Sequence, residues 1–213
     1  YREMKEYGCT FWLAPAVNIH RNPLCGRNFE YYSEDPRLTG AMAAAVTRGV
    51  QQEAGYYVTV KHFACNNQED NRTFVSSVVG ERALREIYLR GFEEAVRSGG
   101  AKGVMTSYNR LNGVYTPNSH DLCTKVLRQE WGFDGVVMTD WSSTRKGQAG
   151  AAAALRAGND LMMPGSGGDR RDILQALRSG MLTEEELRRC CGNVIRAILD
   201  SAVQRDYIDD YQN

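Results

Sequence analysis

The chain has 213 residues, of which 42% are apolar and 24% charged, a composition typical of a globular protein. Its 26 Lys and Arg balance its 26 Asp and Glu, so the formal net charge is zero and gives no general electrostatic reason to bind nucleic acid or an anionic membrane. No stretch reaches the roughly 18 to 20 apolar residues of a transmembrane helix, so we expect neither a nucleic-acid nor a membrane partner.

Short apolar runs rich in β-branched residues recur along the chain. Each has the length and composition of a buried parallel strand. The five runs lie at residues 11–17, 58–63, 103–108, 135–139 and 160–163.

Amphipathic helical patterns lie between these runs and after the last one. Asp35-Pro36 is typical of a helix start, with Asp35 as the N-cap, and Thr183 with Glu186 matches a capping box. Strands that alternate with helices of this length predict an α/β fold with parallel pairing. The predicted helices cover residues 36–53, 81–97, 119–130, 146–157 and 169–178, with a last one from 183 onward.

Polar residues collect where four of the apolar runs end. In a (β/α)8 barrel the carboxyl ends of the strands carry the chemistry, and a charged residue there must pair or react. We therefore predict a TIM barrel of parallel strands rather than an open sheet. Five strand–helix units, against eight for a full barrel, indicate that the barrel is incomplete. The polar segments are Lys61-His62, Ser107-Tyr108-Asn109, Asp140-Trp141 and Pro164-Gly165.

The cysteines and histidines indicate free thiols and no metal. None of the six Cys forms a C-x-x-C pair, and we expect one of the adjacent Cys190 and Cys191 to face the core. Free, mostly buried thiols are typical of a reducing compartment, which favours the cytoplasm. His20, His62 and His120 lack zinc-site spacing, and no Gly-rich phosphate loop follows the first run. We therefore expect no metal and no cofactor.

Asp140 is the first candidate for chemistry. It directly follows the run at 135–139 and precedes Trp141. A carboxylate at a strand end beside an indole suits a nucleophile that attacks the anomeric carbon of a sugar, with the indole as an apolar platform. Alternatively, Asp140 is the N-cap of the helix that follows. Position alone leaves both interpretations open.

Three cationic or imidazole side chains are candidates for binding a sugar. Lys61 and His62 can donate hydrogen bonds to hydroxyls at the strand ends. Lys61 has two alternatives, a Schiff base with a carbonyl substrate, as in aldolases, or an ion pair with a neighbouring acid. Arg27 can hold two vicinal hydroxyls or brace Glu30 or Glu34.

Six blocks of the sequence match one known family in the family's own order. They are LAPAVNIHRNPLCGRNFEYYSEDP (13–36), TVKHFACNNQEDNR (59–72), ERALREIYLRGFE (81–93), VMTSYNRLNGV (104–114), WGFDGVVMTDW (131–141) and AGNDLMMPG (157–165). Through them the sequence closely resembles the barrel domain of glycoside hydrolase family 3, in its β-glucosidase branch. The resemblance covers most of the chain.

The resemblance implies a role for each matching residue. Asp140, in the TDW motif, resembles the catalytic nucleophile, and Trp141 the aromatic wall of the sugar site. Tyr108 resembles the hydroxyl that hydrogen-bonds near the nucleophile, and Met105 a residue that lines the same pocket. The implied mechanism is retaining, through a covalent glycosyl ester on Asp140. The residues that resemble ligands of the non-reducing-end sugar in subsite −1 are Arg27, Lys61, His62 and Arg72.

The chain departs from the family pattern in the residue that moves the proton. In the β-glucosidase branch the acid/base is a Glu on a separate α/β sandwich domain, for which this sequence has no counterpart. An early barrel Asp of the family falls before Tyr1, and Ala64-Cys65-Asn66 replaces the acid/base motif of the N-acetylglucosaminidase branch. We therefore expect residues 1–213 to be the C-terminal portion of the barrel domain, with the sandwich upstream in a parent of permuted domain order.

These expectations combine into a function for the parent protein. We expect a retaining exo-β-glycosidase, a β-glucosidase acting on the non-reducing end of a β-glucoside or oligosaccharide. The isolated chain is expected to be nearly inactive, because loss of the general acid alone costs about 10² to 10⁴ in rate. Its other expected partners are the missing barrel and sandwich segments, or a second copy through unpaired strand edges. The alternatives are a non-catalytic sugar-binding or assembly fragment, and a Schiff-base barrel lyase that uses Lys61.

Overall fold

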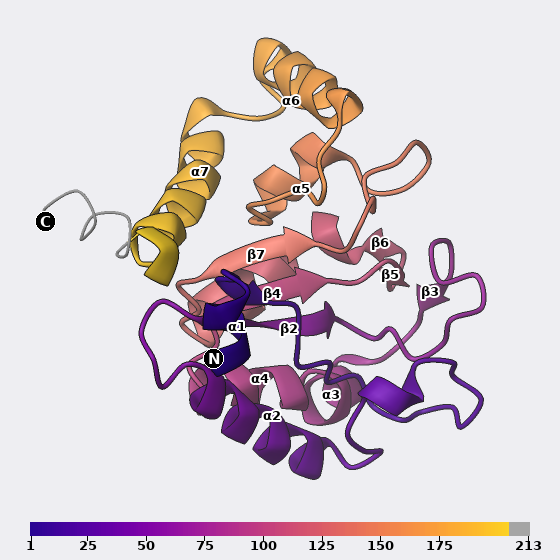
Figure 1. Ribbon diagram of the computed structural model, residues 1–213. Coiled ribbons are helices and arrows are strands. Elements are labelled where there is room, and N and C mark those ends of the chain that lie inside the picture. The colour runs from indigo at the N-terminus through magenta and orange to yellow at the C-terminus, as the bar shows by residue number, and fades with distance from the viewer. Residues whose placement is uncertain (205–213) are drawn as a thin grey trace, which may run out of the picture.

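The computed structural model describes residues 1–204 and has a parallel sheet at its centre (Figure 1). Neighbouring strands are all parallel and are hydrogen-bonded in the order β1-β2-β4-β7. The fifth predicted strand is reduced to one parallel bridge between Leu161 and Met138. The predicted parallel α/β sheet is therefore confirmed, with neighbours in chain order as in a (β/α)8 barrel. The strands are β1 (Phe11–Trp12), β2 (Tyr57–Phe63), β4 (Gly103–Thr106) and β7 (Val136–Thr139).

The first strand is shorter than the predicted run at 11–17. β1 ends at Trp12, and Pro15 has no N–H to donate to a regular ladder. Pairing continues irregularly, since the amide of Lys61 donates to the carbonyl of Pro15 and the amide of Val17 donates to the carbonyl of Lys61. These bonds keep the chain beside β2 and bring the loop that follows to the C-terminal end of the sheet.

The six predicted helices occur in the predicted order, and α1 at the N-terminal end was not predicted. A small second sheet, which the sequence patterns did not predict, joins β3 (Ser76–Ser77), β5 (Arg110–Leu111) and β6 (Val114–Tyr115). Single 3-10 turns lie at Asn28–Glu30 (η1) and Thr116–Asn118 (η3). The helices are α1 (Arg2–Glu6), α2 (Pro36–Val50), α3 (Glu81–Ala83), the π-helical η2 (Leu84–Tyr88), α4 (Arg90–Arg97), the π-helical η4 (Asp121–Glu130), α5 (Ala151–Ala157), α6 (Gly167–Ser179) and α7 (Glu184–Leu199).

The predicted helix starts are confirmed at two positions and wrong at a third. The Asp35 carboxylate caps the first backbone amides of α2, and Thr183 and Glu186 form the capping box of α7. The helix predicted at 146–157 begins only at Ala151. Gly147 has a φ of 85°, a left-handed conformation that a helix cannot contain.

The two faces of the sheet are covered differently. Figure 1 shows α2 and α4 against one face, where Val104 and Val137 belong to the main core together with Phe92 of α4. On the opposite face Met105 belongs to a smaller apolar cluster with Val194 of α7. Successive residues of β4 therefore point to opposite faces. Val104 points toward α2 and α4, and Met105 points toward the inside of the curved sheet.

Two glycines allow the strands to approach closely where β4 and β7 begin. A Cβ on Gly135, just before β7, would lie 2.1 Å from the carbonyl oxygen of Lys102. A Cβ on Gly103, the first residue of β4, would lie 2.7 Å from the carbonyl oxygen of Val58. Because the obstructing atoms belong to backbone, a side chain at either position must move a strand.

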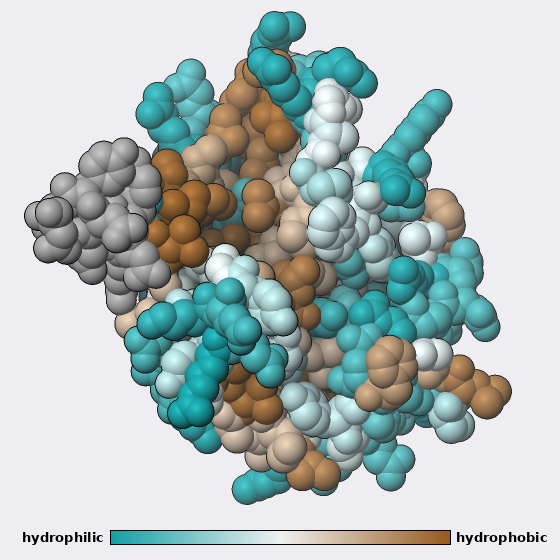
Figure 2. All heavy atoms as spheres, viewed as in Figure 1, coloured by the Kyte–Doolittle hydropathy of each residue, from teal (hydrophilic) through white to brown (hydrophobic). Residues whose placement is uncertain are grey.

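Apolar side chains are exposed on α7 and beside β1. Ile195, Ile198 and Leu199 of α7 are more than half exposed, and Trp12 of β1 is 42% exposed. Figure 2 shows apolar surface gathered beside the C-terminal end of the described chain. Among residues 1–204, β1 is hydrogen-bonded to a strand on one side only, as expected at the edge of an open barrel. No helix in this range has the length and apolar character needed to cross a membrane.

The six cysteines are free thiols. On α7, Cys190 is buried and Cys191 is exposed, which confirms that one of the two faces the core. Burial raises the pKa of the Cys190 and Cys123 thiols to about 12. Both thiols therefore stay protonated near neutral pH and are poor nucleophiles.

Candidate functional site

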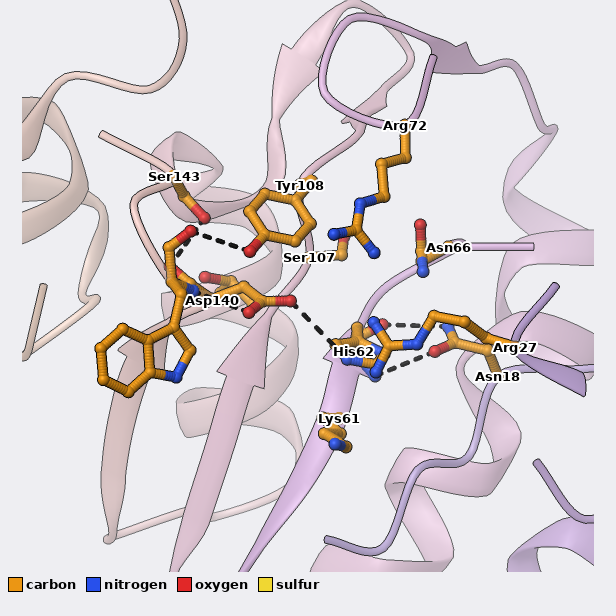
Figure 3. A network of polar contacts seen from close by, with 12 residues as sticks. Asn18, Arg27, Lys61, His62, Asn66, Arg72, Ser107, Tyr108, Asp140 and Ser143 are labelled. Atoms are coloured by element: carbon orange, nitrogen blue, oxygen red, sulfur yellow. Dashed lines mark hydrogen bonds and ion pairs between the residues drawn. The ribbon is translucent and has the colours of Figure 1, made fainter. Parts of the chain in front are cut away.

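Side chains from three neighbouring strands and two loops meet at the C-terminal end of the parallel sheet (Figure 3). Lys61 and His62 lie near the C-terminal end of β2, and Asp140 directly follows β7. The loops contribute cationic side chains that point toward the same place. The predicted site residues that the structure brings together are Arg27, Lys61, His62, Arg72, Tyr108, Asp140 and Trp141.

Asp140 is 6% exposed, and its two carboxylate oxygens differ. Oδ1 accepts a 2.7 Å hydrogen bond from the backbone amide of Trp141. Oδ2 is buried without a hydrogen bond and lies 3.6 Å from Nε2 of His62. Burial raises the pKa of Asp140, and the Trp141 amide, the Tyr108 hydroxyl and the Arg27 guanidinium partly oppose that rise. One oxygen is thus fixed by the backbone, and the other is available to a ligand.

The alternative role of Asp140 as a helix N-cap is wrong. The next helix, α5, begins at Ala151 and has Gly150 as its N-cap. The chain between Asp140 and α5 forms turns, in which the Ser143 hydroxyl donates a 2.9 Å hydrogen bond to the carbonyl of Asp140. The carboxylate of Asp140 therefore faces His62 and not the start of a helix.

His62 is almost completely buried, and its surroundings favour the neutral form of its imidazole. Burial lowers the pKa of His62 well below its usual value, and the charges of Arg27, Lys61 and Arg72 lower it further. A neutral imidazole has one N–H to donate and one nitrogen that accepts. His62 can therefore offer a hydrogen bond to a ligand or to Asp140 without adding a positive charge to the site.

Two residues that sequence reasoning missed hold His62 in place. The side-chain amide of Asn18 donates a 3.0 Å hydrogen bond to the carbonyl of His62 and accepts a 2.9 Å hydrogen bond from its backbone amide. The Tyr31 hydroxyl lies 3.4 Å from Nδ1 of His62. Both residues belong to the matching block at 13–36, but their roles depend on partners 44 and 31 positions away.

The three cations of this cluster are each paired with a glutamate. Glu30 accepts a hydrogen bond from Nε of Arg27 and lies 3.3 Å from Nζ of Lys61. Glu69 accepts a 2.5 Å hydrogen bond from Nη1 of Arg72. The ion-pair alternatives for Arg27 and Lys61 are therefore confirmed. Because a guanidinium has five N–H donors and an ammonium three, each pairing leaves further donors for a ligand.

Tyr108 and Trp141 form the side of the site next to β7. The Tyr108 hydroxyl donates a 2.8 Å hydrogen bond to the carbonyl of Trp141, and the Arg72 guanidinium lies 4.6 Å from the Tyr108 ring centre. Burial, followed by the charge of Asp140, raises the pKa of Tyr108 to about 12, so the phenol keeps its proton. Trp141 is 53% exposed, whereas Met105 is 2% exposed and lies in the apolar cluster on the inner face of the sheet.

The composition of the cluster suits an uncharged polar ligand. Its three cations are balanced by three carboxylates, two of them already paired with those cations. In the part of the chain that the structure describes, no three His, Cys, Asp or Glu side chains form a group able to hold a metal ion. A half-exposed indole beside many hydrogen-bond donors offers an apolar face and a polar wall, the combination that a sugar ring requires.

Known proteins resemble the chain over nearly its whole length. Residues 1–197 match the family model described as the glycosyl hydrolase family 3 N-terminal domain. The chain is 47% identical to a β-glucosidase of Ruminococcus albus over 207 residues and 44% identical to an exo-α-(1→6)-L-arabinopyranosidase of Bifidobacterium longum over 200 residues. The structure of β-glucosidase 3B from Thermotoga neapolitana in complex with glucose matches with a TM-score of 0.90 at 48% identity.

These relatives are much longer than the chain. The two sequence matches cover 93% and 94% of the chain but only 22% and 26% of the relatives. The structural match covers 96% of the chain and 29% of the Thermotoga protein. The chain therefore spans about a quarter of the length of the proteins that it matches.

Proposed function

The chain belongs to glycoside hydrolase family 3, and we propose that it supplies the nucleophile side of the active site of a retaining exo-β-glycosidase, specifically a β-glucosidase. The observation that carries this proposal is Oδ2 of Asp140, a buried carboxylate oxygen without a hydrogen bond at the C-terminal end of β7. The relatives named as β-glucosidases and the glucose complex of the Thermotoga protein support glucose as the sugar.

The proposed reaction proceeds in two displacements at the anomeric carbon. Oδ2 of Asp140 attacks the anomeric carbon. At the same time the bond between that carbon and the leaving-group oxygen breaks, and a general acid protonates the leaving-group oxygen. Water, activated by the same acid/base in its deprotonated form, then attacks the glycosyl ester and releases Asp140. Two inversions leave the configuration at the anomeric carbon unchanged.

The surrounding side chains hold the sugar ring for this attack. Arg27, Lys61 and Arg72 donate hydrogen bonds to hydroxyls through the N–H groups that their glutamate partners leave available, and His62 donates through its neutral ring. The indole of Trp141 packs against one face of the ring. We assign Tyr108 to the hydrogen-bond network of the nucleophile and Met105 to the floor of the pocket, in keeping with the family resemblance.

The general acid is proposed to lie outside residues 1–213. Two observations support this arrangement. Residues 1–204 contain five parallel strand segments, against eight in a full barrel, and the chain covers about a quarter of the relatives. In this proposal the chain is the C-terminal portion of the barrel domain, and a separate α/β sandwich domain brings the acid/base Glu to Asp140. The isolated chain then binds sugar but turns it over at least about 10² to 10⁴ times more slowly than the intact enzyme.

A glycosyl-trapping reagent tests the nucleophile in the intact enzyme that carries the chain. A 2-fluoro-β-glucoside with a good leaving group should leave a glycosyl ester on Asp140, identified by mass spectrometry of the digested protein. Asp140→Asn should not be labelled. A label on another carboxylate would overturn the assignment of the nucleophile, and near-normal activity of the isolated chain on an aryl β-glucoside would overturn the proposed location of the acid.

The same assays separate the alternatives. If an aryl α-L-arabinopyranoside is hydrolysed faster than the β-glucoside, the proposed substrate becomes an arabinopyranoside, in line with the name of the Bifidobacterium relative. Binding of glucose without any labelling or turnover in the intact protein would favour a sugar-binding module. The ion pair of Lys61 with Glu30 counts against the Schiff-base lyase, because an ammonium held by a carboxylate is not a nucleophile. Borohydride trapping of a carbonyl compound on Lys61 would support the Schiff-base lyase instead.

A further inference from the structure

Glu30 contacts two of the side chains proposed to bind the sugar, although no substrate contact is assigned to it. One carboxylate oxygen accepts a hydrogen bond from Nε of Arg27, and the other lies 3.3 Å from Nζ of Lys61. The three side chains are only 17% to 20% exposed. Ion pairs that are this well shielded from water are more strongly coupled than surface pairs.

The backbone around Glu30 explains how one residue reaches both cations. η1 is a single 3-10 turn in which the amide of Glu30 donates to the carbonyl of Arg27 at 3.1 Å, so the two side chains project from the same side. The next residue, Tyr31, points inward to Nδ1 of His62. One turn of chain therefore orients both members of the Lys61-His62 pair, Lys61 through Glu30 and His62 through Tyr31.

The charge of Glu30 is maintained by its partners. Burial alone would raise the pKa of its carboxyl, but the hydrogen bond from Arg27 and the charge of Lys61 lower it below the usual value. Without this carboxylate, Arg27 and Lys61 would repel each other inside a poorly solvated cluster that also contains Arg72. Both side chains are long and flexible, so they would then move apart or turn toward solvent.

We propose that Glu30 is a positioning residue, which holds Arg27 and Lys61 at a fixed separation so that both donate to hydroxyls of the same sugar. This inference rests on the proposed function, because it concerns the sugar of that site. Glu30 itself does not contact the reacting atoms in this proposal. Its effect reaches the substrate only through the two cations that it pairs.

Glu30→Gln in the intact enzyme tests the proposal with little change in side-chain shape. The amide can accept from one cation but turns an N–H₂ donor toward the other, so it cannot hold both. We expect kcat/KM for an aryl β-glucoside to fall about 10- to 100-fold, the range found when an outer partner of a binding group is removed or a group is misplaced. Glu34→Gln is the matched control, since Glu34 lies exposed in the same loop, and it should keep the wild-type value.

A series of deoxy-glucosides separates positioning from mere stability. In the wild-type enzyme, removal of the hydroxyl that Arg27 or Lys61 binds should lower kcat/KM strongly. In Glu30→Gln that penalty should shrink by about fivefold or more, because the donors are already displaced. An unchanged penalty for every deoxy-glucoside would overturn the proposal, since a purely structural defect lowers all substrates alike.

Two further measurements make every outcome decisive. Glu30→Asp keeps the charge on a shorter side chain and should recover part of the activity lost in Glu30→Gln; failure of both variants to fold would assign Glu30 to stability and overturn the proposal. Trapping at Asp140 is measured separately in the wild type. A label on Asp140 with wild-type kinetics in Glu30→Gln would refute the positioning role alone, whereas a missing label would refute the proposed function.

Discussion

Nε2 of His62 lies 3.6 Å from Oδ2 of Asp140, and both side chains are almost completely buried. His62 belongs to β2, and Asp140 directly follows β7. These two strands do not pair with each other, but each pairs with β4. Thr106 of β4 is in register with Phe63 on one side and Thr139 on the other. The residues next to these register partners therefore meet at one end of the sheet, and the pairing of three strands sets the distance between imidazole and carboxylate.

The ionisation of Asp140 leads to a pH prediction. A nucleophile must be deprotonated, so the acidic limb of kcat/KM follows its pKa in the free enzyme. Burial raises this pKa, and the Arg27 and Arg72 charges lower it. Arg72→Gln removes one of those positive charges and leaves Glu69 without its ion partner, and both changes favour the protonated form of Asp140. We expect the acidic limb to move up by about 0.5 to 1 pH unit.

The measurement is a pH profile of kcat/KM in the intact enzyme. Arg82→Gln is the control, since Arg82 is 88% exposed on α3 in an ion pair with Glu86, and its profile should match the wild type. An acidic limb that stays in place or moves down in Arg72→Gln would contradict an ionised Asp140 as the nucleophile.

The buried His62 makes stability depend on pH. Its pKa in the folded protein is well below the ordinary value of 6.5 that applies when the chain is unfolded. As the pH falls through about 6.5, the unfolded chain binds a proton that the folded protein does not, so the free energy of unfolding decreases. His62→Asn cannot take up this proton. Between pH 7 and 5 its stability should fall less steeply, by up to about 1.4 kcal/mol per pH unit.

Urea denaturation at several pH values tests this prediction. The slope that remains in His62→Asn includes Asp140, whose raised pKa acts in the opposite direction because the folded state takes up its proton first. His120→Gln controls for the removal of an exposed histidine. Equal slopes for His62→Asn and the wild type would mean that folding does not lower the pKa of His62.

Trp141 should contribute to sugar binding and little to stability. Its indole is 53% exposed, and its contact with Tyr108 uses the backbone carbonyl, which alanine keeps. We expect Trp141→Ala to raise KM for an aryl β-glucoside about tenfold, a loss of about 1.4 kcal/mol, because the sugar loses the apolar face of the indole. The free energy of unfolding should change by less than about 1 kcal/mol. Trp12→Ala replaces a similarly exposed tryptophan on β1 and should leave KM unchanged. Equal KM values for the two variants would refute the platform role of Trp141.

A buried ion pair anchors the segment that follows β7. Nη2 of Arg128 lies 2.5 Å from Oδ2 of Asp160, whose side chain is completely buried. Arg128→Met should lower the free energy of unfolding by about 3 to 5 kcal/mol, because it leaves that carboxylate without its ion partner. The control on the same helix is Lys125→Met, which breaks a solvent-exposed pair with Asp121 and should have a much smaller effect. Urea denaturation of both variants measures the difference, and similar losses would contradict this account.

The fold could be predicted from the sequence where a segment carries its own pattern. The apolar runs around Val60, Val104 and Val137 predicted parallel strands, and the cap at Asp35 predicted the start of α2. The second sheet escaped prediction because strands of two residues, such as Ser76–Ser77, have no periodicity. The late start of α5 escaped it because the helical pattern does not reveal that Gly147 adopts a left-handed φ.

Site residues could be predicted where a reactive or hydrogen-bonding side chain stands at the end of a strand. Lys61, His62 and Asp140 stand directly at such ends, and the family resemblance added the arginines from the loops. Asn18 and Tyr31 could not be selected from the sequence, since an amide and a phenol in a loop have many local uses. Their contacts with His62 exist only after β1 and β2 have paired and the loop at 20–35 has folded over the sheet.

The glycine at position 135 bears on how sequence variation in this chain should be interpreted. It precedes β7, at the opposite end of that strand from Asp140, and any Cβ there would meet the backbone of Lys102. A deep mutational scan scored by hydrolysis would rank Gly135 with the catalytic positions, because moving β7 also moves the carboxylate at its far end. Gly80, with open space around its Cβ position and an ordinary φ of −70°, should tolerate replacement in the same scan. A map of intolerant positions would therefore outline the whole length of β7. Intolerance alone would not distinguish Asp140, which reacts, from Gly135, which fixes the position of the strand.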